Sequence, residues 1–273
     1  MKRKVIPVLI GLLLIVLILA GAAGVFLFQR YSGTSDLADL NAYFGLNGSQ
    51  EVAIVWNQEL AEEKGLLQDE RCYLKLDTVH EMLNERFYVD HNEKLLLYTL
   101  PEETVQIGIG EQTADGYTAA VEQDGDVWLA LDYVKQYSDF NYTLYTEPNR
   151  VVLTTNWDTL QSAELKKNTA LRVRGGAKSE VLQNLEKGTK VTVLEEMENW
   201  DQVQTQDGYI GYVQKKHLTD PAEETPVKDT GYVEPDYTGN LRDHKIDLAW
   251  HQVTVESANS TFPGVMSGVT GVN

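Results

Sequence analysis

Residues 169–218 read "TALRVRGGAKSEVLQNLEKGTKVTVLEEMENWDQVQTQDGYIGYVQKKHL", and their pattern is the most informative of the chain about its fold. Its strand-like runs are ALRVR, KVTVLEE, WDQVQT and YIGYV, and the turn signals GG, EKG, EMEN and QDG lie among them. Short strands at close spacing, separated by glycine-containing turns, predict a small closed β-barrel. Closure removes unpaired strand edges, which suits a domain of about 55 residues.

This stretch resembles a bacterial SH3 domain, and we place the predicted domain at residues 163–219. The resemblance rests on LRVRGG, VLQNLEKGTKVTVL, NW and GYIGYV. Arg172 departs from the pattern, because the family commonly carries asparagine there. That departure puts any ligand contact of the asparagine in doubt, but not the fold. The resemblance implies a partner in the bacterial cell wall, namely peptidoglycan.

Four residues of the predicted barrel are candidates for ligand binding: Trp200, Tyr209, Tyr212 and Arg174. Aromatic rings on a small barrel can line a groove for glycan or stem-peptide chains. The alternative is that Trp200 and Tyr212 complete the barrel core. Tyr209 alternates with Ile210, so we expect Tyr209 to be exposed and to be the better ligand candidate. For Arg174 the choice is between pairing with a wall carboxylate and a solvated position in a turn.

Residues 36–158 contain an internal repeat. CYLKLDTVHEMLNERFYVDHNEKLLLYTL (residues 72–100) aligns with VWLALDYVKQYSDFNYTLYTEPNRVVLTT (residues 127–155). Each copy predicts a short strand, a helix that has Asp77 or Asp132 as its N-cap, and a hairpin. The layout resembles the copper amine oxidase N-terminal-like domain found in stalks of exported proteins, and implies a duplicated α+β stalk.

No metal and no cofactor are expected in this stalk, in spite of the name of the family it resembles. His80 and His91 are the histidines available there, and no further histidine lies nearby in the sequence. Two histidines alone predict a surface pair and not a metal site. Cys72 is the single cysteine of the chain, and its strand-like neighbours RCYLKL predict a buried, inert thiol.

The N-terminus, residues 1–33, combines a basic tip with a long apolar run. Lys2, Arg3 and Lys4 precede an uninterrupted apolar stretch from Val5 to Phe28. A membrane-spanning helix needs about 20 such residues, so the stretch predicts a single-pass anchor. The basic tip predicts a cytoplasmic N-terminus, with the bulk of the chain outside a Gram-positive cell. Cleavage at the small-residue run AGAAG is the alternative.

The C-terminal part divides into two predicted segments. Residues 220–243 (DPAEETPVKDTGYVEPDYTGNLRD) are acidic and proline-containing, which predicts a linker without its own core. Residues 244–273 contain KIDLAWHQV and ANSTF, which resemble the first unit of a family 18 glycoside hydrolase barrel. The resemblance implies the incomplete start of a (β/α) barrel.

That resemblance bears on catalysis. Family 18 enzymes carry a D-x-x-D-x-D-x-E motif, which this sequence lacks, so the chain as written is expected to have no catalytic residues. We expect it to be the targeting part of a longer glycoside hydrolase acting on polymers that contain N-acetylglucosamine. The alternative is a complete, non-enzymatic surface spacer or protein-interaction protein.

The net charge of −18 lies mostly between residues 36 and 162. Such a field repels phosphate backbones, which excludes nucleic acid as an expected partner.

Taken together, the segments predict a fold class that is mainly β with short helices: α+β stalk repeats, then a small SH3-like β-barrel. One transmembrane helix is expected before these parts, and the truncated start of a (β/α) barrel after them.

Overall fold

The structure is a computed structural model that describes residues 2–228, with side chains described for residues 11–27 and 32–228. Two predictions lie outside the described residues. They are the second part of the predicted linker, residues 229–243, and the predicted (β/α) barrel start, residues 244–273. Within residues 2–228 no (β/α) barrel is present.

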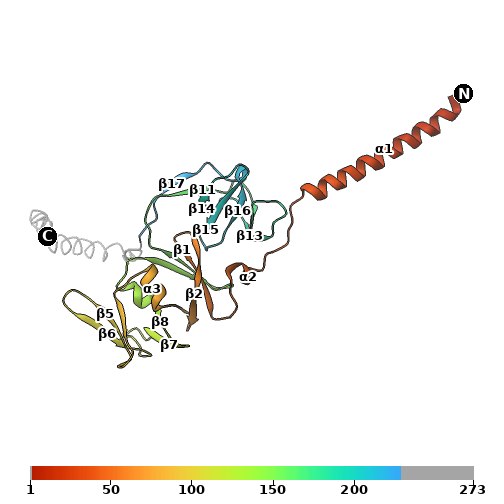
Figure 1. The fold of residues 1–273 in the computed structure, drawn as a ribbon. Coiled ribbons are helices and arrows are strands. Elements are labelled where there is room, and N and C mark those ends of the chain that lie inside the picture. The colour runs from red at the N-terminus through yellow and green to blue at the C-terminus, as the bar shows by residue number, and fades with distance from the viewer. Residues whose placement is uncertain (1, 229–273) are drawn as a thin grey trace, which may run out of the picture. The chain divides into compact units, whose positions relative to one another are not determined.

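Between α1 and residue 228, short β-strands are the main regular secondary structure (Figure 1). The strands of the described chain are β1 (Glu51–Trp56), β2 (Glu59–Gln68), β3 (Arg71–Lys75), β4 (Phe87–Asp90), β5 (Leu95–Thr99), β6 (Thr104–Gly108), β7 (Ala120–Gln123), β8 (Asp126–Ala130), β9 (Asn141–Tyr145), β10 (Arg150–Thr154), β11 (Leu160–Glu164), β12 (Thr169–Arg172), β13 (Val181–Leu185), β14 (Lys190–Glu195), β15 (Trp200–Thr205), β16 (Ile210–Gln214) and β17 (Ala222–Glu224). The helices are α1 (Lys2–Tyr31), α2 (Leu40–Phe44), α3 (Leu76–Met82), α4 (Leu131–Lys135) and the 3₁₀ helix η1 (Lys215–His217).

The predicted single-pass anchor is corrected by the structure. Within residues 2–228, no helix is both long enough and apolar enough to cross a membrane. This finding overturns both the transmembrane helix assigned to Val5 to Phe28 and the topology assigned to Lys2, Arg3 and Lys4.

The N-terminal β-rich unit is built on a sheet with the strand order β7-β8-β3-β2-β1-β10-β9. The aligned strands of the internal repeat, β3 and β8, are antiparallel neighbours, and the equivalent residues Leu74 and Leu129 are register partners. Each of these strands leads directly into a short helix, α3 or α4. The hairpins differ, because β4 and β5 form a separate sheet with β6, whereas β10 joins β1 in parallel.

The two aspartates expected to cap the helices occupy other positions. Lys75 and Ala130 are the N-cap residues, and neither makes a side-chain capping bond. Asp77 and Asp132 are the second residues of α3 and α4, because each strand leads into its helix without a loop. Asp132 instead accepts hydrogen bonds from the Arg71 guanidinium and, at 2.6 Å, from the Tyr142 hydroxyl.

The barrel unit has the strand order β13-β12-β16-β15-β14-β11-β17. In β14, Val191 and Val193 are buried and Thr192 between them is not, which is the alternation of a half-buried strand. Strand β17 pairs with β11 and so extends this sheet. The first part of the predicted linker is therefore a strand, and its backbone is paired with the barrel.

One hydrophobic core joins the barrel to the N-terminal unit. The barrel residues Leu171 and Val203 share a cluster of buried side chains with Phe44, Ala53 and Val55. Phe44 ends α2, and the other two residues of the N-terminal unit come from β1. The packing therefore crosses the predicted boundary between stalk and barrel, and a fragment cut at residue 163 loses part of the barrel's core.

Candidate functional site

The aromatic face of the barrel is formed by Trp200, Tyr212 and Gly175, which we call the aromatic platform. Trp200 opposes Gln214 across β15 and β16, and Gln202 opposes Tyr212, so Trp200 and Tyr212 are diagonal neighbours on the same face. Both side chains are half-buried. A Cβ atom on Gly175 would lie 3.3 Å from Trp200 Cβ and 3.5 Å from Tyr212 Cδ1, so the glycine backbone packs against both rings. The rings thus keep a surface that a ligand can contact.

Arg172 explains how the loop beside the platform is held. Its Nη1 donates to the carbonyl oxygen of Ser179 at 2.6 Å, and the Ser179 hydroxyl accepts from the Arg174 backbone N–H at 2.9 Å. Partial burial lowers the pKa of the Arg172 guanidinium below its ordinary value. Arg172 is thus a loop-positioning residue, while Arg174 is exposed at the loop's start and remains a ligand candidate.

The structure corrects the prediction that Tyr209 is exposed. Tyr209 is only 5% exposed, and its ring centroid lies 5.3 Å from that of Phe44. The Arg150 guanidinium lies 4.5 Å from the centre of the Tyr209 ring. Tyr209 alternates with Ile210 as expected, but the face it occupies is covered by the N-terminal unit. It therefore joins the two units and does not belong to the aromatic platform.

A cleft of ≈ 590 Å³ adjoins the platform at Trp200. Three of its charged groups are paired with one another: Lys215 Nζ lies 2.5 Å from Glu196 Oε2 and 3.8 Å from Oδ1 of the buried Asp201. Asp201 also accepts from the Met197 backbone N–H at 3.1 Å. This network fixes the end of β14 and the start of β15, and so positions Trp200.

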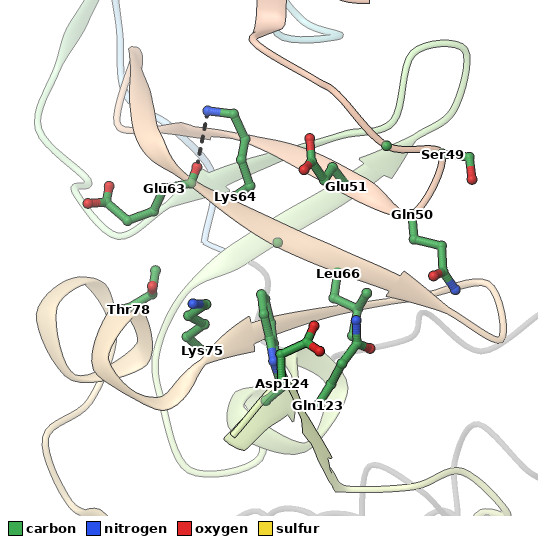
Figure 2. Close-up of a pocket in the computed structure, with 13 residues that line it drawn as sticks. Ser49, Gln50, Glu51, Glu63, Lys64, Leu66, Lys75, Thr78, Gln123 and Asp124 are labelled. Carbon is green, nitrogen blue, oxygen red and sulfur yellow. Dashed lines mark hydrogen bonds between the residues drawn. The ribbon is translucent and has the colours of Figure 1, made fainter. Parts of the chain in front are cut away.

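A cleft of ≈ 600 Å³ lies in the N-terminal unit, beside the part of β2 that does not pair with β3, and Figure 2 shows residues that line it. The Lys64 ammonium donates to the carbonyl oxygens of Ala61, at 3.3 Å, and Glu62, at 2.8 Å. Lys75 Nζ lies 2.5 Å from Asp126 Oδ2. Both lysines of the cleft thus have partners within the protein, and the cleft offers no free cation to a ligand.

The structure confirms that Cys72 is buried. It is 2% exposed, and burial raises the pKa of its thiol far above the ordinary value. His80 was expected on the surface, but it is half-buried, and its Nε2 lies 2.7 Å from the carbonyl oxygen of Phe87. His91 is exposed in the β4–β5 turn, as expected. Within residues 2–228, no group of three or more His, Cys, Asp or Glu side chains is placed to hold a metal ion.

Comparison with known families identifies the barrel. The family model described as "Bacterial SH3 domain" matches residues 167–219. This chain contains a bacterial SH3 domain. The match covers strands β12 to β16 and η1, and it confirms the resemblance expressed by LRVRGG and GYIGYV. The aromatic platform therefore belongs entirely to the SH3 domain.

Two curated relatives are similar to part of the chain, and both are named "Probable endopeptidase p60". The protein of Listeria innocua is 45% identical over 62 residues, which are 22% of this chain and 13% of the relative. The protein of Listeria monocytogenes is 40% identical over 73 residues, which are 26% of this chain and 15% of the relative. The chain thus spans only a small part of the length of these relatives.

A solved structure, NlpC1 from Trichomonas vaginalis, shows 15% identity over 49% of this chain and 40% of that chain, with a TM-score of 0.21. At this TM-score the likeness supports no inference. The matches found are to an SH3 domain and to p60 endopeptidases, and they give no support to the resemblances to family 18 glycoside hydrolases and to the copper amine oxidase stalk.

His217 gives the SH3 domain a predicted pH dependence. Its Nδ1 lies 2.8 Å from the Thr169 hydroxyl, and its Nε2 is buried without a hydrogen-bond partner in the described structure. Burial, together with the charges of Lys167 and Lys216, lowers the pKa of His217 below its ordinary value of 6.5. The fold thus favours the neutral imidazole, and the unfolded chain binds the proton more readily. The contribution of His217 to the free energy of unfolding is therefore complete above about pH 6.5 and is lost as the pH falls through the folded-state pKa.

We expect His217→Gln to flatten the acid side of the stability profile, measured by urea unfolding between about pH 7.5 and 5. His91→Gln is the matched control, because His91 is exposed in a turn of the N-terminal unit. The control should keep the wild-type slope. Equal slopes in wild type and the His217 variant would contradict the prediction.

The sequence did not indicate two features that shape the site. Tyr43 and Arg150 bind the SH3 domain from the N-terminal unit, through the Ile210 backbone and Asp207 respectively. Tyr43 lies outside every motif, Arg150 lies in the internal repeat at a position that indicates no partner, and each is separated from its partner by a long stretch of sequence. Only pairwise contact information, such as co-varying positions, carries a signal of this kind.

Proposed function

We propose that this chain binds bacterial cell-wall polymer through its SH3 domain and serves as the wall-targeting region of an envelope protein. The observation that carries the proposal is the SH3 domain at residues 167–219, with the half-exposed Trp200 and Tyr212 side by side on its face. Aromatic rings at the centre of an interface supply much of its binding free energy, which suits a groove for sugar or peptide chains.

The p60 relatives are named as probable endopeptidases, so we propose that wall targeting in this protein accompanies hydrolysis of wall components. The role of this chain in that process is binding. Nucleophilic attack by a cysteine requires an accessible thiolate. Cys72, the single cysteine of the sequence, is buried with a raised pKa and cannot supply one.

Sedimentation with purified Gram-positive peptidoglycan sacculi tests the proposal. The full chain should pellet with sacculi at physiological salt. Trp200→Ala should raise the dissociation constant about tenfold or more, because truncation of a central aromatic residue commonly removes about 2 kcal/mol of binding free energy. Trp200 is half-exposed, so its truncation should leave the unfolding midpoint nearly unchanged.

The matched control is Trp157→Ala, which removes the same side chain outside the SH3 domain. This variant should sediment like the wild type. Failure of the wild-type chain to pellet with sacculi would overturn the proposed function. Wild-type sedimentation of the Trp200 variant would remove the aromatic platform from the binding surface.

A further inference from the structure

A cleft of ≈ 850 Å³ lies between the turn of the β1–β2 hairpin and the SH3 domain. The hairpin contributes Gln58, Glu59 and Leu60 to its lining, and the barrel contributes Glu195, Gln202 and Tyr212, among others. Ligand sites in proteins occupy about 300–1,000 Å³, so the cleft can hold a short peptide segment. It begins at the platform residue Tyr212 and extends the binding face onto the N-terminal unit.

The hairpin side of the cleft is held in place. Asn57 Oδ1 accepts the backbone N–H groups of Thr155, at 2.9 Å, and Asn156, at 3.1 Å. On the barrel side, the Tyr43 hydroxyl donates to the carbonyl oxygen of Ile210 at 2.6 Å and accepts from its N–H at 3.1 Å. The cleft is thus formed before a ligand arrives, and binding need not order its surroundings.

The turn also retains a side chain at a position that favours glycine. Asn57 and Gln58 have φ values of 45° and 71°, which are the left-handed conformation of a two-residue hairpin turn. Glycine is the preferred second residue of such a turn, and a glutamine there is strained. Gln58 lines the cleft, so its carboxamide is available to the amide groups of a ligand.

The charged residues that line the cleft are all acidic. Glu59 and Glu195 line it and are exposed, and the described lining includes no lysine, arginine or histidine. Carboxamides and apolar side chains complete the surface, with Gln58 and Gln202 beside Leu60. Carboxylates without a matching cation favour a positively charged ligand, and the carboxamides suit the N–H and C=O groups of a peptide.

We propose that this cleft binds a peptide segment carrying a free ammonium group, with Glu59 and Glu195 recognising the cation. The inference rests on the proposed function and deepens it. The peptide part of the wall polymer lies in the cleft beside Tyr212, and the aromatic platform contacts the adjoining part of the same ligand. Specificity for amine-bearing peptide thus comes from a residue of each unit.

Backbone amide NMR of the full chain, titrated with the blocked tripeptide N-acetyl-Ala-Lys-Ala amide, whose lysine side chain carries its one ammonium group, tests the inference. The free peptide should shift the amides of residues 57–60 and 192–195, and its Nε-acetylated form should bind at least about fivefold more weakly, because the ion pairs are lost. The double variant Glu59→Gln/Glu195→Gln should weaken binding of the free peptide to the same extent. It should leave binding of the acetylated peptide unchanged.

Glu102→Gln/Glu103→Gln is the matched control, because it removes the same charge from an exposed turn between β5 and β6. It should bind the free peptide within about twofold of wild type. Absence of shifts at the cleft, or equal binding of both peptides, overturns the inference. If sacculi pellet the chain but the peptide does not bind, the proposed function stands alone. If the peptide binds and sacculi do not, the proposed function falls, and with it the assignment of the cleft to wall peptide.

Discussion

Arg150→Ala is expected to lower the free energy of unfolding by about 3 kcal/mol, the lower end of the usual effect of removing one partner of a buried ion pair, because the Asp207 side chain is 27% exposed. Arg150 is 4% exposed at the start of β10. Its Nε donates to the carbonyl oxygen of Asp207 at 2.5 Å, and its Nη2 donates to the Asp207 carboxylate at 3.0 Å. A third bond, from Nη1, reaches the carbonyl oxygen of Pro148 at 3.0 Å.

Aromatic rings surround the same guanidinium. Its Cζ lies 4.5 Å from the centre of the Tyr209 ring and 5.0 Å from that of Tyr145. Alanine at position 150 leaves the Asp207 carboxylate beside these rings without its cation, and it opens a cavity between the two units. Both units should lose stability together, because they share the core that contains Phe44.

Chemical unfolding, followed by tryptophan fluorescence and far-UV circular dichroism, measures this loss. Lys190→Ala is the control, because Lys190 pairs with Glu224 at the surface and the loss of such a pair changes stability by about 0–1 kcal/mol. Arg150→Lys should fall between the two, since an ammonium cannot reproduce the forked geometry of the guanidinium. A change below about 1 kcal/mol in Arg150→Ala would show that the pair does not join the units.

Arg150 and Tyr209 show where sequence reasoning reached its limit. The alternation in GYIGYV placed Tyr209 and Ile210 on opposite faces, and the structure agrees with that alternation. It could not show which face is covered, because the covering residues, Phe44 and Arg150, come from a separate part of the chain. Local periodicity defines the faces of a strand, whereas burial of a face depends on long-range packing.

The SH3 barrel was predictable because its information is local. The short alternating strands and the glycine turns all lie within the 53 consecutive residues that match the family model. No distant segment is needed to define the order of these strands along the sequence. The helix caps were not predictable in the same way. Asp132 has the chemistry of an N-cap, but its carboxylate bonds to Arg71 and Tyr142, which the fold brings to it from other strands.

Gly211→Ala is expected to lower the free energy of unfolding by about 3 kcal/mol, at the upper end of the usual range for overpacking a core. Gly211 lies in β16, where it opposes Val203 of β15. A Cβ atom there would lie 2.7 Å from the backbone oxygen of Arg172 and 2.9 Å from Leu171 Cγ. Real Cβ atoms do not approach backbone oxygen this closely, so β12 must move away from β16 to admit the methyl group.

That movement has a functional consequence, because β12 and β16 meet at Arg172 and Tyr212. Separation of these strands displaces Tyr212 from the aromatic platform and releases the loop that Arg172 holds. Sedimentation with sacculi should therefore weaken even at temperatures where the variant remains folded. A variant that is less stable but binds with wild-type affinity would show that the platform does not depend on the β12–β16 contact.

Gly176→Ala is the matched control for this substitution. A Cβ atom on Gly176 would meet no atom within 4 Å, and its φ lies outside the left-handed region. Both variants replace glycine with alanine in the same domain, so they restrict the unfolded chain to the same extent, and their difference reports the folded state. Gly176→Ala should stay within about 0.5 kcal/mol of wild type. Equal stability of the two variants would mean that the barrel adjusts to a methyl group between β12 and β16, and the close approach of Gly211 to Arg172 would then not be needed for the fold.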